Sequence, residues 1–238
     1  MKIGAIILSR LDSERLPGKA LLSVAGRPLI DYVMSFCRRI KGIDIIVLAT
    51  SDRAVDNPLA EFAEQIGIPC VRGALDDVAG RFLLVMDKFD LDGAVRVNGD
   101  SPLNDARLLS EGVRIFRKGN TDMVSNVTKR TYPYGMSMEI VGRKAMEYAY
   151  SKMNSDLHKE HVTKYLYDHK KQFQIHTITS GQPHFSGVQL AVDTQEDLDR
   201  FTWIINQLKC DPAEADINTI VNLAIRSPMS IGLKHSLN

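Results

Sequence analysis

The chain has 238 residues, of which 44% are hydrophobic and 25% charged, so it is long and apolar enough to bury a sizeable core. A formal net charge of +1 excludes a protein that binds a polyanion through unbalanced lysine and arginine, so we expect no nucleic acid partner. No apolar run approaches the length of a membrane span and no signal peptide is recognisable, so we expect neither export nor a membrane partner.

The cysteines predict a reducing compartment. Cys37, Cys70 and Cys210 are scattered, odd in number and free of the CxxC spacing of a metal or redox site. This usage is typical of reduced thiols in a cytoplasmic protein. A nucleophilic cysteine is the less favoured alternative.

Short apolar runs alternate with helical patterns over the first 120 residues. The runs have the β-branched composition of buried parallel strands and lie at 3–8, 43–49, 69–71 and 93–97. The helical patterns lie at 28–39, 58–67, 77–89 and 105–117. This alternation predicts right-handed crossovers and an α/β fold with a doubly wound, mostly parallel sheet.

The regular alternation of apolar runs and helical patterns ends after residue 123, where a turn-like stretch leads into a segment with both strands and helices. Strands are expected at 137–141, 173–178 and 188–192, and helices at 143–152, 158–168, 194–208 and 213–226. We expect the main sheet to resume near Val188. Residues 124–187 are therefore predicted to be an inserted α+β segment, a lid or dimerisation element, within one domain spanning 1–238. The tail beyond Ser227 is expected to be loosely ordered.

The segment 9–19, SRLDSERLPGK, places the cations Arg10, Arg15 and Lys19 on a loop directly after the first apolar run. A loop that leaves the carboxyl end of a strand in an open α/β sheet lies where ligands bind. Guanidinium and ammonium groups form strong, charge-assisted hydrogen bonds to phosphate oxygens. The loop therefore predicts a triphosphate site.

Two acids follow expected strands in the same way. Asp100 and Asp193 are both predicted at strand ends, beside the cationic loop. Magnesium takes one or two protein carboxylates together with phosphate oxygens and water, so the pair predicts a Mg²⁺ site. Taken alone, the NGDSP motif is equally well explained as a turn, and Thr194 as the N-cap of a helix.

Other nucleotide and metal motifs are missing from the sequence. The glycines are too sparse for GxGxxG or GxxxxGK[ST], which argues against a dinucleotide oxidoreductase and a P-loop hydrolase. His158 and His161 lie three apart on an expected helix, but they lack the HExxH spacing and a third ligand, so zinc is disfavoured. No residue is identified as a general base.

Four motifs resemble a known family. They are SRLDSERLPGKALLSVAGRPLIDYV at 9–33, LATSD at 48–52, NGDSPL at 98–103 and AVDTQEDL at 191–198. Their order and spacing are similar to the cytidylyltransferases that activate acidic sugars. The phrases TSDxxxDNPL, RGxxxDVxGR, YPxG and EHVT, at 50–59, 72–81, 132–135 and 160–163, resemble the spore-coat polysaccharide biosynthesis branch. The chain departs from that branch at Ser137, where an acid is common.

The resemblance implies that CTP and an acidic sugar, of the octulosonate or nonulosonate type, react with Mg²⁺ as cofactor to give a CMP-sugar and pyrophosphate. It implies that Asp100 and Asp193 hold Mg²⁺ and that Arg10, Lys19 and Asp100 are catalytic. The nucleotide contacts it implies are Leu8, Ser9, Arg10, Arg15, Lys19, Arg72, Arg81, Asn98 and Asp100. The sugar contacts it implies are Arg81, Glu139 and His161.

Three alternatives stay open at this point. The acceptor could be a phosphorylated or phosphonate alcohol. A sugar transferase of the same architecture is disfavoured because its Asp-x-Asp motif is missing around Asp100, and a non-catalytic partner is disfavoured because the cationic loop is intact. The resemblance also implies a homodimer, with the 124–187 segment reaching the neighbouring subunit.

Overall fold

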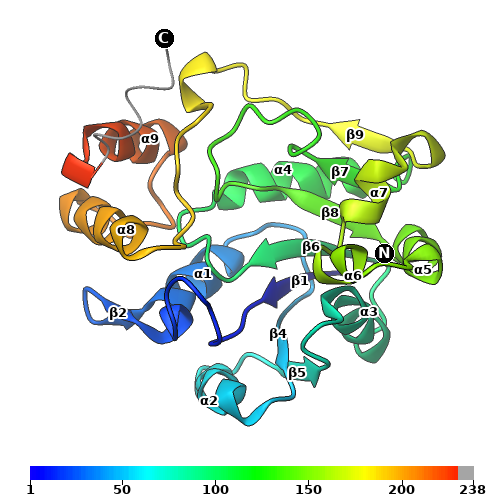
Figure 1. Cartoon of the computed structure of the whole chain (residues 1–238). Coiled ribbons are helices and arrows are strands. Elements are labelled where there is room, and N and C mark those ends of the chain that lie inside the picture. The colour runs from blue at the N-terminus through cyan, green and yellow to red at the C-terminus, as the bar shows by residue number, and fades with distance from the viewer. Residues whose placement is uncertain (230–238) are drawn as a thin grey trace.

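The fold is built on one seven-stranded sheet with helices on both faces, as the computed structural model of residues 1–229 shows (Figure 1). The strand order is β5-β4-β1-β6-β8-β7-β9. The strands are β1 (Ile3–Leu8), β4 (Ile45–Ser51), β5 (Cys70–Gly73), β6 (Gly93–Asn98), β7 (Met123–Ser125), β8 (Glu139–Gly142) and β9 (Ile175–Thr177). The tail beyond Ser227, expected to be loosely ordered, lies almost wholly outside the described residues.

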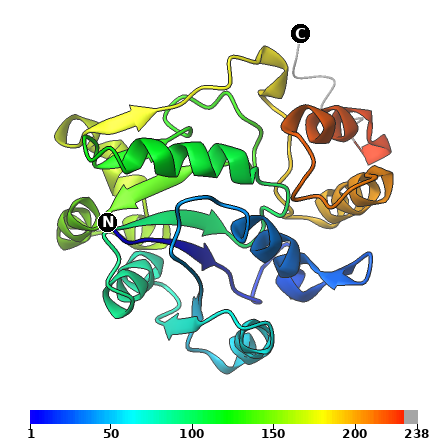
Figure 2. The same cartoon turned by 180° about the vertical axis from the view of Figure 1, so that it is seen from behind.

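The helices cover the two faces of the sheet in separate groups. They are α1 (Leu29–Cys37), α2 (Asn57–Gln65), α3 (Val78–Lys88), α4 (Ala106–Phe116), α5 (Arg143–Lys152), α6 (Asp156–Glu160), α7 (Lys164–Asp168), α8 (Gln195–Gln207) and α9 (Ile217–Arg226). Side chains of α1, α2 and α4 pack on one face, seen in front in Figure 2, and those of α3, α5 and α7 on the other. No helix among the described residues combines the length and apolar character needed to cross a bilayer.

The predicted parallel half of the sheet is confirmed. β1 pairs in parallel with both β4 and β6, and β4 with β5. These strands are buried on both faces, which explains their continuous apolar sequences. In the β1–β6 register Leu8 lies opposite Asn98, so the segments that follow these residues leave the same edge of the sheet.

The strand expected at 188–192 is the main error in the predicted layout of the second half of the chain. Residues 188–192 do not rejoin the sheet, because their pairing is an isolated bridge between Tyr134 and Gln189. Val188, Leu190 and Val192 are buried instead against α1 and α8, so their alternation reflects a helix-packed extended segment. The sheet is completed by β7, which was not expected as a strand, and by β8 and β9.

The 124–187 segment thus contributes strands to the main sheet as well as helices. β8 is antiparallel to both β6 and β7, while β9 is parallel to β7. The helix expected at 158–168 divides into α6 and α7 around residues 161–163. The role of the segment as a lid or subunit contact stays a prediction.

Small elements join the cationic loop to α1. A 3₁₀ turn, η1 (Lys19–Leu21), is followed by the hairpin of β2 (Ser23–Val24) and β3 (Arg27–Pro28). Short 3₁₀ turns also occur at η2 (Ala54–Asp56), η3 (Lys170–Gln172) and η4 (Pro183–Phe185). Pro28 ends the hairpin and caps α1, so the expected helix begins one residue later.

We expect Gly135→Ala to destabilise the fold more than Gly181→Ala. Both glycines have a left-handed φ, +91° and +66°, where a Cβ costs roughly 1–2 kcal/mol. At Gly135 the Cβ would also lie 2.5 Å from the backbone nitrogen of Ala191, whereas at Gly181 nothing lies within 4 Å. This overpacking adds about 1–3 kcal/mol. Urea unfolding measures both losses, and equal losses would contradict the close approach at Ala191.

Candidate active site

The cationic loop is held in place by the turn η2 that follows strand β4. Asp56 is fully buried and accepts hydrogen bonds from the Leu11 backbone N–H at 2.7 Å and from the Ser51 hydroxyl. The Gly18 N–H closes the loop on the Leu11 carbonyl at 2.8 Å. Gly18 has a φ of +69°, which suits glycine directly before Lys19. The loop therefore has a defined shape set by its own backbone.

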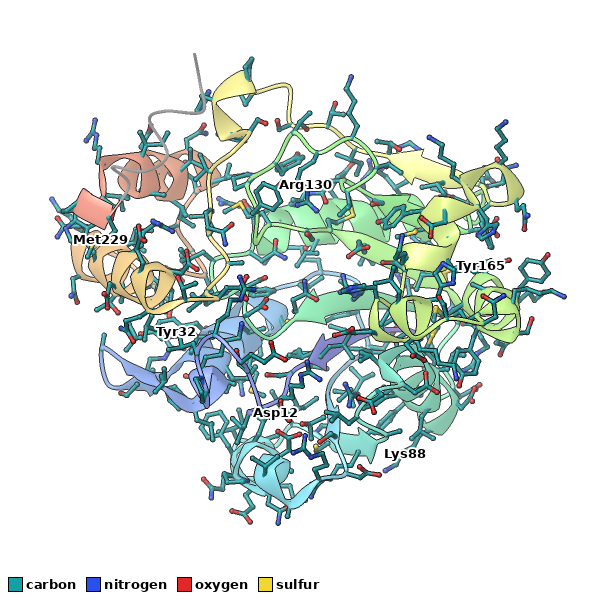
Figure 3. All side chains as sticks on the ribbon, viewed as in Figure 1. Asp12, Tyr32, Lys88, Arg130, Tyr165 and Met229 are labelled. Atoms are coloured by element: carbon teal, nitrogen blue, oxygen red, sulfur yellow. The ribbon has the colours of Figure 1, made fainter. Side chains whose placement is uncertain are left out.

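A second contact anchors the tip of the same loop. Asp12, labelled in Figure 3, lies on the loop after β1, and its carboxylate pairs with Arg53 of the connection between β4 and α2. Both side chains are largely exposed, so this ion pair contributes little to stability beyond orienting the loop.

Lys19 is the centre of the site. Its ammonium group donates to Asp100 Oδ2 at 3.3 Å, to Asp193 Oδ1 at 2.9 Å and to the Val192 carbonyl at 2.8 Å. Its side chain is only 12% exposed, so these contacts are well shielded from water. Arg15 contacts the other oxygen of Asp193 at 3.2 Å. Two cations and two acids from three distant parts of the chain are thus brought together.

The register of the sheet explains the position of Asp100. The Gly99 N–H donates to the Leu8 carbonyl at 2.8 Å, which continues the β1–β6 pairing past the strand end. A Cβ on Gly99 would lie 2.5 Å from both Cβ and Oγ of Ser9, so only glycine allows the two chains to approach here. Asp100 follows directly and faces the loop.

Asp193 is positioned by a helix N-terminus. Thr194 is the N-cap of α8 and forms a capping box with Asp197, as the alternative interpretation of this threonine predicted. Asp197 also accepts from the Asp193 backbone N–H at 3.1 Å. The Val192 N–H donates to the Asp100 carbonyl at 2.8 Å, which ties the extended segment to the end of β6. Asp193 therefore reaches the site without a preceding strand.

A cleft of about 500 Å³ opens beside these residues. It is lined by Leu8, Ser9, Arg10, Ser13, Glu14, Arg15, Lys19, Ala20, Val78, Arg81, Asn98, Gly99, Asp100, Glu160, His161 and Asp193. The lining includes every predicted nucleotide and metal residue except Arg72. The described residues thus confirm the juxtaposition that was expected from the separate motifs, while the role of each residue stays a prediction.

Arg10 and Arg81 line the cleft with few close contacts of their own. Arg10 approaches Glu160 only at 3.9 Å. Arg81 is 4% exposed, donates once, to the Ala74 carbonyl at 3.1 Å, and has a buried Nε without a partner among the described residues. Burial lowers the pKa of Arg81 and outweighs the nearby Asp56, which raises it, while Arg10 acts in the same direction as burial. A negatively charged ligand in the cleft would pair with these two guanidinium groups.

Helix α3 is fixed so that Arg81 faces the cleft. Asp77 caps the helix by accepting from the Gly80 N–H at 2.8 Å, and the Tyr150 hydroxyl of α5 donates to the same carboxylate at 2.5 Å. The hydrogen bond to Asp77 raises the pKa of Tyr150 to about 12, so the phenol keeps its proton. A Cβ on Gly80 would collide with both partners.

Two expected contacts are not brought to the cleft. Arg72 donates instead to the Ser51 carbonyl at 2.9 Å, the Arg53 carbonyl at 2.7 Å and the Asn57 side chain at 2.8 Å, so it holds the end of β4. Glu139 is buried beneath α7. Its carboxylate is surrounded by protein groups, and it does not line the cleft. Arg72 and Glu139 therefore stabilise the structure around the site and do not line the cleft.

Sequence reasoning missed Asp56 and Arg96. Asp56 lies inside the quoted motif TSDxxxDNPL, but nothing in its spacing distinguished a buried acid from a helix-capping one. Arg96 is a lone charged residue in the apolar strand β6, which was a usable signal. Its Nη1 contacts Glu139 Oε2 at 2.5 Å.

Asp100 and Asp193 fit a magnesium ion. Both carboxylates already share one cation, and their hard oxygens are the donors that Mg²⁺ prefers. Magnesium commonly takes its other ligands from phosphate oxygens and water. No cluster of three or more His, Cys, Asp or Glu side chains suited to a metal occurs among the described residues. His158 Nε2 lies 3.0 Å from the Asp168 carboxylate, which accepts its hydrogen bond, and so has a local partner.

An open α/β sheet with a cationic, carboxylate-bearing cleft at the carboxyl ends of its parallel strands defines a nucleotide-binding, phosphate-handling protein. Residues 4–229 match the family model described as cytidylyltransferase. The chain belongs to the cytidylyltransferase family and is a CTP-dependent nucleotidyltransferase.

Individual relatives agree with this assignment. The chain is 26% identical over 227 residues to the spore coat polysaccharide biosynthesis protein SpsF of Bacillus subtilis, covering 91% of this chain and 92% of that protein. A cytidylyltransferase from Leptospira borgpetersenii superposes with a TM-score of 0.90 at 24% identity, covering 100% and 98% of the chains. A CMP:2-keto-3-deoxy-manno-octonic acid synthetase complexed with CTP has a TM-score of 0.65 at 18% identity, covering 87% and 99%.

We expect Glu139→Gln to lower stability at neutral pH by about 3 kcal/mol, because it leaves the Arg96 charge without its buried partner. Burial alone would raise the pKa of Glu139, but Arg96, Thr163 and Tyr167 together hold that pKa below its ordinary value. Glu139 therefore stabilises the fold above the ordinary glutamate pKa of about 4.3, and this contribution is lost as the pH falls below it.

Urea unfolding at a series of pH values tests this expectation. The gap between wild type and Glu139→Gln should narrow as the pH is lowered below about 4. The control is Glu147→Gln, which removes an exposed partner of Arg143 at 3.8 Å and should cost no more than about 0.5 kcal/mol. A pH-independent gap would contradict a charged Glu139.

Proposed function

We propose that this chain uses CTP and Mg²⁺ to activate an acidic sugar, of the octulosonate or nonulosonate type, as a CMP-sugar with release of pyrophosphate, for surface polysaccharide or glycan biosynthesis. The observation that carries the proposal is the ammonium group of Lys19, which lies between Asp100 and Asp193 at the mouth of a cationic cleft. Such a site suits the transfer of a phosphoryl group between two anionic substrates.

The residues divide into two roles in this reaction. Lys19, Arg15 and Arg10 would bind the triphosphate and stabilise the charge that develops on the departing pyrophosphate. Asp100 and Asp193 would hold Mg²⁺, which when bound polarises phosphate oxygens as a Lewis acid. Leu8, Ser9, Asn98 and Arg81 would complete the nucleotide site.

The bond changes are those of an in-line displacement. A hydroxyl oxygen of the acceptor attacks the α-phosphorus of CTP, the bond from this phosphorus to the bridging oxygen breaks, and pyrophosphate leaves with the electron pair. The hydroxyl proton passes to solvent or to a phosphate oxygen. Fixed cations around the phosphates would act through orientation and electrostatic stabilisation, which would supply most of the rate.

The names of two relatives support an acidic acceptor. SpsF is named for spore coat polysaccharide biosynthesis, and the synthetase of the CTP complex is named for an octulosonic acid. Arg81 and His161 line the cleft where such an acceptor would lie. A phosphorylated or phosphonate alcohol is the second candidate, because the same cations would bind it. A homodimer and a cytoplasmic location are proposed with the same activity.

The defining experiment is pyrophosphate release with each of the four nucleoside triphosphates, Mg²⁺ and a panel of octulosonic, nonulosonic and phosphorylated acceptors. We expect release with CTP and one anionic acceptor, and loss of release when EDTA removes the metal. The absence of release from CTP across the panel would reject the proposed reaction with these acceptor classes.

We expect Asp100→Asn to lower kcat by about 100-fold or more, because it removes a negative charge that holds the metal against the phosphates. The matched control is Asp105→Asn. Asp105 caps α4 through the Arg107 N–H at 2.7 Å, and asparagine caps helices equally well. Asp105→Asn should unfold near the wild-type urea concentration, and Asp100→Asn, although less stable without its Lys19 contact, should remain folded under the assay conditions. Normal turnover in a folded Asp100→Asn protein would reject the metal assignment.

A further inference from the structure

Arg96 is a partly buried strand residue with unused hydrogen-bonding capacity. It lies on β6, and its side chain is 18% exposed. Nη1 donates to Glu139 Oε2 at 2.5 Å, while Nε is buried without a partner and Nη2 makes no hydrogen bond within the described residues. The guanidinium therefore has one occupied edge and one free edge, formed by Nε and Nη2.

Glu139 is fully occupied in holding Arg96. Its Oε2 accepts from Arg96, and its Oε1 accepts from the Thr163 and Tyr167 hydroxyls, each at 2.7 Å. The Tyr167 hydroxyl is in turn 2.7 Å from the Ser125 hydroxyl. With its side chain 3% exposed, Glu139 has no oxygen left for a ligand. It fixes the orientation of Arg96, as a supporting group does in a pre-organised site.

Arg96 is not one of the residues that line the cleft, but its strand leads to the cleft wall. Alternation along β6 places Arg96 on the same face of the sheet as Asn98, which lines the cleft. On the opposite side, His161 lines the cleft and Thr163, two residues later, bonds to Glu139. The break between α6 and α7 thus connects the cleft wall to the Arg96–Glu139 pair.

We propose that the free edge of Arg96 binds the anionic group of the acceptor, a carboxylate or a phosphoryl group. This inference rests on the proposed function. The two parallel N–H donors of a guanidinium edge match two oxygens of one oxyanion, which an ammonium group cannot do in the same geometry. Lys19, Arg10 and Arg15 lie on the loop after β1, so Arg96 would supply a separate set of N–H donors for a second anionic substrate.

Titration calorimetry on the CMP-saturated protein tests this site without turnover. The two probes are 3-deoxy-manno-octulosonate, which carries a carboxylate, and glycerol 3-phosphate, which carries a phosphoryl group. We expect one probe to bind the wild type and to bind Arg96→Lys and Arg96→Met at least tenfold more weakly. CMP should bind all three proteins equally. Arg96→Lys keeps the charge, so it separates loss of the two-donor edge from loss of the fold.

The matched control is Arg143→Lys, which alters an arginine that contacts Asp87 at 2.5 Å and the Leu91 carbonyl at 2.7 Å, away from the cleft lining. It should bind the probe like the wild type. Unchanged binding in a folded Arg96→Lys or Arg96→Met protein would overturn the inference, as would the failure of both probes to bind the wild type.

Kinetics distinguish failure of this inference from failure of the proposed function. Arg96→Lys should raise the KM for the acceptor at least tenfold and leave the KM for CTP unchanged. If Arg96→Lys releases pyrophosphate with an unaltered acceptor KM, the proposed role of Arg96 is rejected and the proposed function is retained. Binding of a probe that depends on Arg96, without pyrophosphate release in the wild type, would reject the reaction and retain the anion site.

Discussion

The shared contact of Lys19 with Asp100, Asp193 and the Val192 carbonyl is the constraint on which the site depends. It joins the loop after β1, the end of β6 and the segment before α8, which are far apart in the sequence. A shielded ammonium group without these acids would be poorly solvated, and the acids without it would repel each other. The three segments therefore stabilise one another, and the contacts of Lys19 with the two acids hold them in the arrangement that forms the cleft.

The parallel half of the sheet could be predicted from the sequence because its strands are buried on both faces and are separated by capped helices. The extended segment with Val188 and Leu190 could not, because an apolar side chain alternates in the same way whether it packs on a sheet or on helices. The division between α6 and α7 depends on the distant Glu139, which accepts from Thr163, so no local pattern indicates it.

The candidate site, like the fold, was only partly predictable from the sequence. Lys19 and Asp100 were predictable, since they follow strands whose ends could be located. Asp193 was predicted from a strand end that does not form, yet the structure brings all three residues together. Arg72 and Glu139 were expected in the cleft because motif resemblance specifies a residue but not the direction of its side chain. Both are satisfied by neighbouring protein groups. Arg96 carried a signal of its own, a charge within a buried strand, whose meaning depended on knowing its partner.

The buried carboxylate of Asp56, which holds the Leu11 N–H and thereby the loop, has a consequence for how nucleotide enters. A loop that is ordered before binding loses little conformational entropy when a triphosphate arrives. The rate of association is then governed by diffusion and by attraction between the phosphates and the cations at the cleft mouth, rather than by a folding step of the loop. Nucleotide capture in this protein is accordingly an encounter with a preformed surface.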